Sequence, residues 1–142
     1  IKHYQKFTVN IPDETSMLVM EQAGFISHRE KLKHLGLDYE ISERTHAPIL
    51  ESCPVVLDCQ VDRIVEEDGI CHIFAKILDR LANPELLDDK GHFKNDCFAP
   101  TYFMGDGYQR VYRYLDNRVD PMGSFIKKVR QKDDKSRVAR KN

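Results

Sequence analysis

The sequence lacks several features that define whole classes of proteins. It contains no tryptophan, and none of its apolar runs approaches the roughly 18 residues that a transmembrane helix requires. The N-terminus shows no basic segment followed by an apolar one, so no secretory signal is visible. The 142 residues are 41% hydrophobic and 32% charged, which is typical of one soluble domain. We therefore expect a cytoplasmic protein without a membrane partner.

Common catalytic and metal-binding motifs are also missing. No two of the six histidines have the H-E-x-x-H spacing of a zinc site, and no G-x-S-x-G motif marks a hydrolase nucleophile. Gly105 and Gly107 begin a G-x-G pattern, but Arg110 stands where a nucleotide-binding loop has its third glycine. Aromatic residues flank these glycines on both sides, which favours a hairpin turn. The sequence therefore predicts no metal site and identifies no catalytic residue.

None of the four cysteines, at positions 53, 59, 71 and 97, forms a C-x-x-C pair. An extended strand would separate Cys53 from Cys59 by about 20 Å, whereas a disulfide needs Cα atoms within about 7 Å. Cys59 and Cys71 fall on the apolar faces of expected strands, so we expect both to be buried and inert. We predict that all four are reduced thiols in a reducing compartment.

The net charge of −1 hides an uneven distribution. Residues 127–142 carry a net charge of +6, and residues 1–126 carry −7. A nucleic-acid-binding domain spreads lysine and arginine over a folded face, so the acidic body argues against a nucleic-acid partner. Residues 131–142 are predicted to be a basic, disordered tail, and the alternative is a tail that binds an anionic partner or directs localisation.

The periodicity of apolar residues predicts a mainly β or α+β fold with short helices. Strands do not alternate with long helices, which disfavours a doubly wound dinucleotide-binding fold. The expected strands are 6–11, 55–65, 70–81, 102–104 and 108–114, and the expected helices are 14–24, 27–36 and 120–130. The second and third strands form a long antiparallel hairpin. In its first strand Leu57, Cys59 and Val61 alternate with Asp58 and Gln60, which predicts one buried face and one wet face.

Residues 27–33 carry the most informative local pattern. Ser27 and Glu30 form an S-x-x-E capping box, which predicts the start of a short helix. A helix N-terminus attracts anions through its free N–H groups. Arg29 and Lys33 are four residues apart, so a helix would place both cations on one face, where they can hold a phosphate. The same pattern is typical of a capped surface helix in which Glu30 pairs with Lys33.

Four stretches of sequence follow one another in a recognisable order. They are FTVNIP at 7–12, AGFISHREKLKHLGL at 23–37, APILESCPVVLDCQVDRIVEEDGICHIFAKILD at 47–79 and PTYFMGDGYQRVYR at 100–113. In this order they resemble the flavin reductase-like family, the FMN-binding split barrels that include flavoredoxin. The stretch at 47–59 is the most specific part, because it follows the pattern A-P-x-[LI]-x-x-C-P-V-x-L-x-C.

The chain departs from the family pattern in two ways. His28 replaces the usual glycine of the 27–33 segment, and His34 replaces the phenylalanine that follows the lysine. The family's first barrel strands, which carry many flavin contacts, would precede Ile1, so we expect that a segment has been removed. The resemblance thus implies a split-barrel domain over 1–130 that is partial at its N-terminus.

The resemblance also implies a function. It assigns Ser27, Arg29 and Lys33 to the phosphate of bound FMN, and it implies NAD(P)H as the electron donor. The protein would pass hydride or electrons through the flavin to free flavin, oxygen or a partner protein, and it would form a homodimer. One alternative is a non-catalytic or truncated split-barrel binding module that has lost flavin. The other is a barrel that holds a different anionic ligand.

Overall fold

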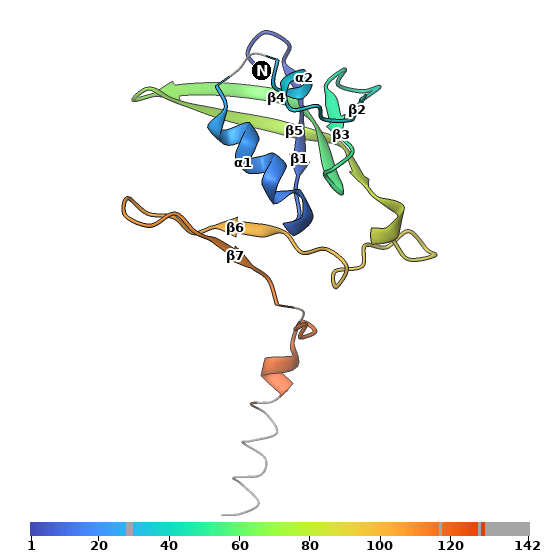
Figure 1. Cartoon of the computed structure of the whole chain (residues 1–142). Helices are drawn as coiled ribbons and strands as arrows, with labels where there is room; N and C mark the ends of the chain where they lie inside the picture. Colours follow the sequence, from blue (N-terminus) through green and yellow to red (C-terminus); the bar gives the residue numbers. More distant parts are fainter. Residues whose placement is uncertain (28–29, 117, 128, 130–142) are drawn as a thin grey trace, which may run out of the picture.

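The computed structural model describes residues 1–27, 30–116, 118–127 and 129, and Figure 1 shows the arrangement of its elements. The predicted domain boundary at residue 130 and the predicted tail at 131–142 lie outside these residues. Helical segments are short. In chain order the elements are β1 (Lys6–Ile11), the 3-10 turn η1 (Glu14–Ser16), α1 (Met17–Phe25), α2 (Lys31–His34), β2 (Tyr39–Ile41), β3 (Pro48–Leu50), β4 (Val55–Glu67), β5 (Ile70–Ala82), the 3-10 turn η2 (Pro84–Leu86), β6 (Thr101–Phe103) and β7 (Tyr112–Tyr114).

The main sheet has the strand order β1-β4-β5, and both of its strand pairs are antiparallel. β4 and β5 form the predicted long hairpin, the longest ribbon in Figure 1. Asp68 and Gly69 form its two-residue turn. Both have positive φ, as a type I′ hairpin turn requires. β2 pairs with β3, and β6 pairs with β7 around the predicted glycine turn. The architecture confirms the predicted fold class, a mainly β protein with short helices.

The prediction of one buried and one wet face along β4 is wrong at Asp58. Cys59 and Val61 are buried as expected, but Asp58 is only 2% exposed and lies on the opposite face of the strand, together with the buried Val56. The reason is that the loop between β2 and β3 covers that face. The alternation of polar and apolar residues misleads here because the polar member has its own buried partners.

Hydroxyl groups of the β2–β3 loop hold the Asp58 carboxylate. Ser42 Oγ donates to Asp58 Oδ2, and Thr45 Oγ1 donates to Asp58 Oδ1, each across 2.8 Å. Both loop residues are buried. Arg44 lies between them and donates from Nε to Asp79 Oδ2 of β5 across 2.9 Å. We call this cluster of Ser42, Thr45 and Asp58 the Asp58 clamp. It attaches the β2–β3 sheet to β4, the middle strand of the main sheet.

The side chain of Asn10 joins the two sheets at a second point. Its Oδ1 accepts a hydrogen bond from the Leu50 N–H across 2.8 Å, and its Nδ2 donates to the Pro48 carbonyl across 3.2 Å. Thr8 Oγ1 donates to the same carbonyl across 2.6 Å. The amide of Asn10 therefore replaces the backbone pairing that β3 lacks on this side, which gives the asparagine of the stretch FTVNIP a structural role.

The prediction that Cys71 is buried is wrong. Cys59 is buried in the sheet, but Cys71 is exposed near the tip of the β4–β5 hairpin, where it lies opposite Glu66. This outer part of the hairpin extends past β1, whose register with β4 ends at Gln60. Residues 70–72 of β5 are all exposed, so no described element packs over the face that carries Cys71. All four cysteines are free thiols. No helix within the described residues is long and apolar enough to span a membrane.

Candidate functional site

The 27–33 segment connects two helices. α1 ends at Phe25, where the Ile26 N–H donates to the Gln22 carbonyl across 3.0 Å. α2 spans Lys31–His34 with Glu30 as its N-cap residue. The predicted capping box is therefore wrong, because the helix begins three residues later than a box starting at Ser27 requires. Ser27 instead lies exposed in the connection between the two helices.

Two of the three predicted phosphate ligands lie within the described structure. Ser27 and Lys33 are both exposed, whereas Arg29 lies outside the described residues. α2 starts after position 29, so the argument that Arg29 and Lys33 share one helix face does not apply. The side chain of Lys33 makes no ion pair or hydrogen bond with any described residue, Glu30 included. Its ammonium group therefore faces solvent.

Lys31 fixes the position of α2, a role that was not predicted from the sequence. Its Nζ donates to the Ala23 carbonyl across 2.6 Å, near the C-terminal end of α1. A cation at this end of a helix is favourable because the last carbonyl groups carry partial negative charge. The ammonium group of Lys31 is thus bonded to α1, whereas that of Lys33 has no partner among the described residues. The only signal in the sequence is a lysine that closely follows an expected helix end.

The end of α2 is fixed by a glycine, as the sequence predicted. Gly36 has φ of +60°, its N–H donates to the Lys33 carbonyl across 3.2 Å, and the Leu37 N–H donates to the Leu32 carbonyl across 2.9 Å. This pair of bonds is a Schellman motif, in which glycine adopts the left-handed conformation with little strain. Lys33 therefore lies on a short helix whose C-terminal end is fixed by Gly36.

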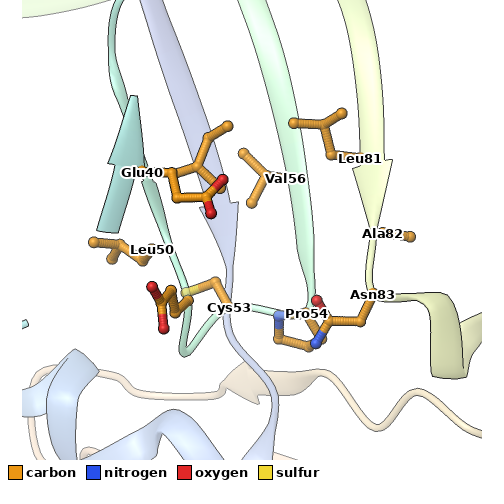
Figure 2. Close-up of a pocket in the computed structure, with 10 residues that line it drawn as sticks. Glu40, Leu50, Cys53, Pro54, Val56, Leu81, Ala82 and Asn83 are labelled. Atoms are coloured by element: carbon orange, nitrogen blue, oxygen red, sulfur yellow. The ribbon is translucent and has the colours of Figure 1, made fainter. Parts of the chain in front are cut away.

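A cavity of about 320 Å³ lies where β2 and β3 meet the adjoining ends of β4 and β5. Figure 2 shows Glu40 of β2 next to Val56, with Cys53, Pro54 and Asn83 below them. Among the described residues, the lining contains the carboxylates of Glu40 and Glu51 and no basic side chain. Its charge therefore disfavours a phosphate, so this cavity does not compete with the 27–33 segment for that role.

Cys53 in this cavity is not an activated nucleophile. The residue is buried, and loss of hydration raises the pKa of its thiol above the ordinary range. A raised pKa keeps the thiol protonated at neutral pH, and the thiolate is the reactive form. Burial also raises the pKa of the Cys59 thiol. No group of three or more metal-ligating side chains occurs among the described residues.

Comparison with known proteins identifies related sequences and structures. Residues 1–111 match the flavin reductase like domain. The fold is similar to flavoredoxin of Desulfovibrio vulgaris (Miyazaki F), with a TM-score of 0.74 and 21% identity over 87% of this chain and 66% of that one. Flavoredoxin from Methanosarcina acetivorans gives a TM-score of 0.74 and 17% identity over 89% of this chain and 68% of that one. An FMN-binding protein from Thermus thermophilus, solved with bound 1-cyclohex-2-enone, gives a TM-score of 0.63 and 16% identity over 82% of this chain and 61% of that one.

The matches differ in how much of each protein they cover. The chain spans less than two thirds of the Desulfovibrio flavoredoxin, at 66%, and of the Thermus protein, at 61%. None of the curated proteins compared with the chain matches it. The fold is that of the split-barrel flavin reductases. Since the domain match extends from residue 1 to residue 111, the chain belongs to the flavin reductase-like family.

Proposed function

We propose that this protein binds FMN through the 27–33 segment and acts as a flavin reductase-like oxidoreductase. In that role it passes hydride or electrons from NAD(P)H through the flavin to free flavin or to a partner protein. The observation that carries the proposal is Lys33, whose exposed ammonium group has no partner among the described residues. It follows Ser27 at the spacing of the serine-to-lysine segment that the family uses near the FMN phosphate.

The residues of this segment fit a phosphate group. A phosphate dianion is bound best by charged donors and hydroxyl groups, and Lys33 and Ser27 offer one of each to solvent. Lys31 does not take part, because its ammonium group is bonded to the Ala23 carbonyl. Arg29, outside the described residues, is the proposed third ligand. The flavin supplies the hydride chemistry when bound, and the protein holds and orients it.

The preference for FMN over riboflavin tests this proposal. The two ligands share the ring system and differ by the phosphate, so the proposed contacts act on FMN alone. A charge-assisted contact contributes about 1.5–3 kcal/mol, which is about ten- to a hundredfold in dissociation constant. Titration by quenching of flavin fluorescence measures both constants. Equal affinities for the two ligands would remove the phosphate site from the 27–33 segment.

A binding module without flavin is the second candidate. The observation that favours it is that Ser27 and Lys33, the described residues proposed to hold FMN, are exposed and line neither the cavity beside Cys53 nor the cleft between α1 and the β6–β7 hairpin. The visible absorption spectrum of the purified protein separates the two candidates. Bound flavin gives a yellow protein whose absorption disappears from the protein fraction on denaturation and filtration. A colourless protein that also takes up no added FMN identifies the binding module.

The exposed apolar residues of β5 support the proposal of a homodimer. Ile70, Phe74, Ile77 and Leu78 of this strand are all exposed, and β5 pairs with β4 alone in the part of the sheet that the structure describes. An edge strand with unpaired backbone groups and exposed apolar side chains can pair with a second chain. We further propose a cytoplasmic location, since free cysteines persist in reducing compartments. Light scattering during size-exclusion chromatography measures the oligomeric state.

A further inference from the structure

A second, larger cleft lies between α1 and the β6–β7 hairpin. Its volume is about 760 Å³, and its lining contains three aromatic rings, from Phe25 of α1, Phe103 of β6 and Tyr112 of β7. Figure 1 shows the two elements that form its walls. Small-molecule sites are typically concave, largely apolar and of about 300–1,000 Å³, with a few polar groups that fix orientation.

The hairpin wall of this cleft holds its aromatic rings in place. Phe103 and Tyr112 pack edge to face, with ring centroids 5.9 Å apart. The Phe103 ring also lies over Gly105, where a Cβ atom would come within 2.2 Å of it. Only glycine leaves room for the ring in this position. Phe103 is thus fixed by two neighbours, yet it remains 59% exposed.

The helical wall offers an open surface. Gly24 of α1 lines the cleft, and a Cβ atom added there would meet no atom within 4 Å. No side chain therefore fills the cleft at this position of the helix. The next residue, Phe25, is 78% exposed. A large ring that is mostly exposed beside a concave surface is costly to hydrate. A flat apolar ligand that enters the cleft removes part of both Phe25 and Phe103 from water.

The charged groups of the cleft indicate the polarity of the ligand. Arg110 makes no ion pair or hydrogen bond with the described residues. Asp106, near it in the turn, already accepts from the N–H groups of Tyr108 and Gln109, each across 2.7 Å, and these bonds lower its pKa. Arg110 is therefore the available cation. Glu21 on α1 and the ionised Asp106 add two negative charges, which disfavour a ligand with two or more acid groups.

We propose that this cleft binds a planar aromatic monocarboxylate, with the ring system between Phe25 and Phe103 and the carboxylate at Arg110. Guanidinium and carboxylate groups form two parallel hydrogen bonds, which fixes the orientation of the ligand as well as attracting it. The site involves none of Ser27, Arg29 and Lys33. The inference therefore goes beyond flavin binding and does not depend on it.

The full chain, with no flavin added, tests this proposal with 2-naphthoate as the probe and uncharged 2-naphthamide as its matched ligand. Calorimetric titration gives both dissociation constants. Arg110→Gln should weaken 2-naphthoate binding about tenfold and leave 2-naphthamide unchanged. Arg113→Gln is the control, because Arg113 lies on the same hairpin and does not line the cleft. Failure of the folded wild type to bind 2-naphthoate, or equal weakening by the two arginine variants, overturns the proposal.

A second variant tests the location independently of charge. Gly24→Leu should fill the cleft and weaken both 2-naphthoate and 2-naphthamide by at least tenfold. Its side chain points into open space from a helix, where leucine is more favourable than glycine, so the fold should persist. A thermal melt confirms folding of each variant. Unchanged binding of both ligands by folded Gly24→Leu places them elsewhere and overturns the proposal. If this variant does not fold, the arginine pair decides.

Discussion

The hydroxyl group of Ser42 donates a hydrogen bond of 2.8 Å to the buried carboxylate of Asp58, sixteen residues further along the chain. Thr45 satisfies the second carboxylate oxygen at the same distance. The Ser42 oxygen in turn accepts from the N–H groups of Arg44 and Thr45, each across 3.2 Å. A buried polar network of this kind specifies one arrangement of its elements, because every other arrangement leaves polar groups unpaired.

Replacement of Asp58 by alanine should destabilise the fold strongly. The change leaves the buried hydroxyl groups of Ser42 and Thr45 without their acceptor, and we expect a loss of about 2–4 kcal/mol in the free energy of unfolding. Asp62→Ala is the control on the same strand, because Asp62 pairs with Lys76 across 3.1 Å on the exposed surface, and its loss should cost less than about 1 kcal/mol. Urea unfolding measures both. Equal losses would show that the Asp58 clamp contributes no more than a surface pair.

Replacement of Lys33 by alanine should weaken FMN binding about ten- to a hundredfold with little effect on stability. The side chain is exposed and has no partner in the described structure, so its removal should change stability within about 0.5 kcal/mol. Lys31→Ala is the matched variant, because it loses the bond to the Ala23 carbonyl and should lower the melting temperature. FMN titration together with a thermal melt gives the comparison. Unchanged FMN affinity in folded Lys33→Ala would return this residue to the surface-helix interpretation.

The four thiols should divide into two pairs during labelling. Cys71 and Cys97 are exposed and should react quickly with a thiol reagent, whereas the buried Cys53 and Cys59 should react only after denaturant is added. Burial also raises the pKa of both buried thiols, which lowers their thiolate fraction at neutral pH and further protects them in the native state. Mass spectrometry of the labelled protein counts the modified sites. Rapid native labelling of Cys59 would contradict the burial of β4.

The tip of the β6–β7 hairpin should lose stability in acid. Hydrogen bonds from the N–H groups of Gln109 and Tyr108 lower the pKa of Asp106 in the folded state. A lowered pKa stabilises the fold at pH values above the unfolded-state pKa, which is near 3.9 for aspartate, and this contribution disappears as the pH falls through the folded-state pKa. Asp106→Asn should therefore be less stable than the wild type at neutral pH and nearly equal to it in strong acid. A difference that does not shrink below about pH 4 would contradict this mechanism.

The long hairpin was predictable because its signals are local. Alternating residues and the Asp68–Gly69 turn define β4 and β5 without reference to the rest of the chain. The burial of Asp58 was not predictable, because it depends on a loop whose hydroxyl groups lie more than ten residues away in sequence. The exposure of Cys71 was missed for a related reason: a strand pattern shows which residues share a face, but it does not show whether another element packs on that face.

The sequence indicates candidate residues for a phosphate site, but it does not indicate the local structure around them. The resemblance places Ser27, Arg29 and Lys33 in a phosphate-binding segment, and the structure keeps Ser27 and Lys33 exposed. The capping box was misplaced because a serine followed by a glutamate also occurs in a connection that ends just before a helix. The true start at Lys31 depends on the contact of that lysine with α1, a tertiary interaction that overrides the local signal.

The two register shifts of the β4–β5 hairpin cancel each other. Between Asp58 and Cys59 the partner strand gains one extra residue, Leu78, and between Val61 and Arg63 the extra residue is Asp62 of β4 itself. Each strand therefore carries one extra residue, and the register between β4 and β5 beyond both shifts is the same as in a hairpin without them. Deletion of Leu78 alone would displace every cross-strand neighbour on one side by a single step, and a single step reverses which face each side chain occupies. Deletion of both residues would restore continuous cross-strand pairing from Val55 to the turn. The double deletion should therefore destabilise the fold less than either single deletion.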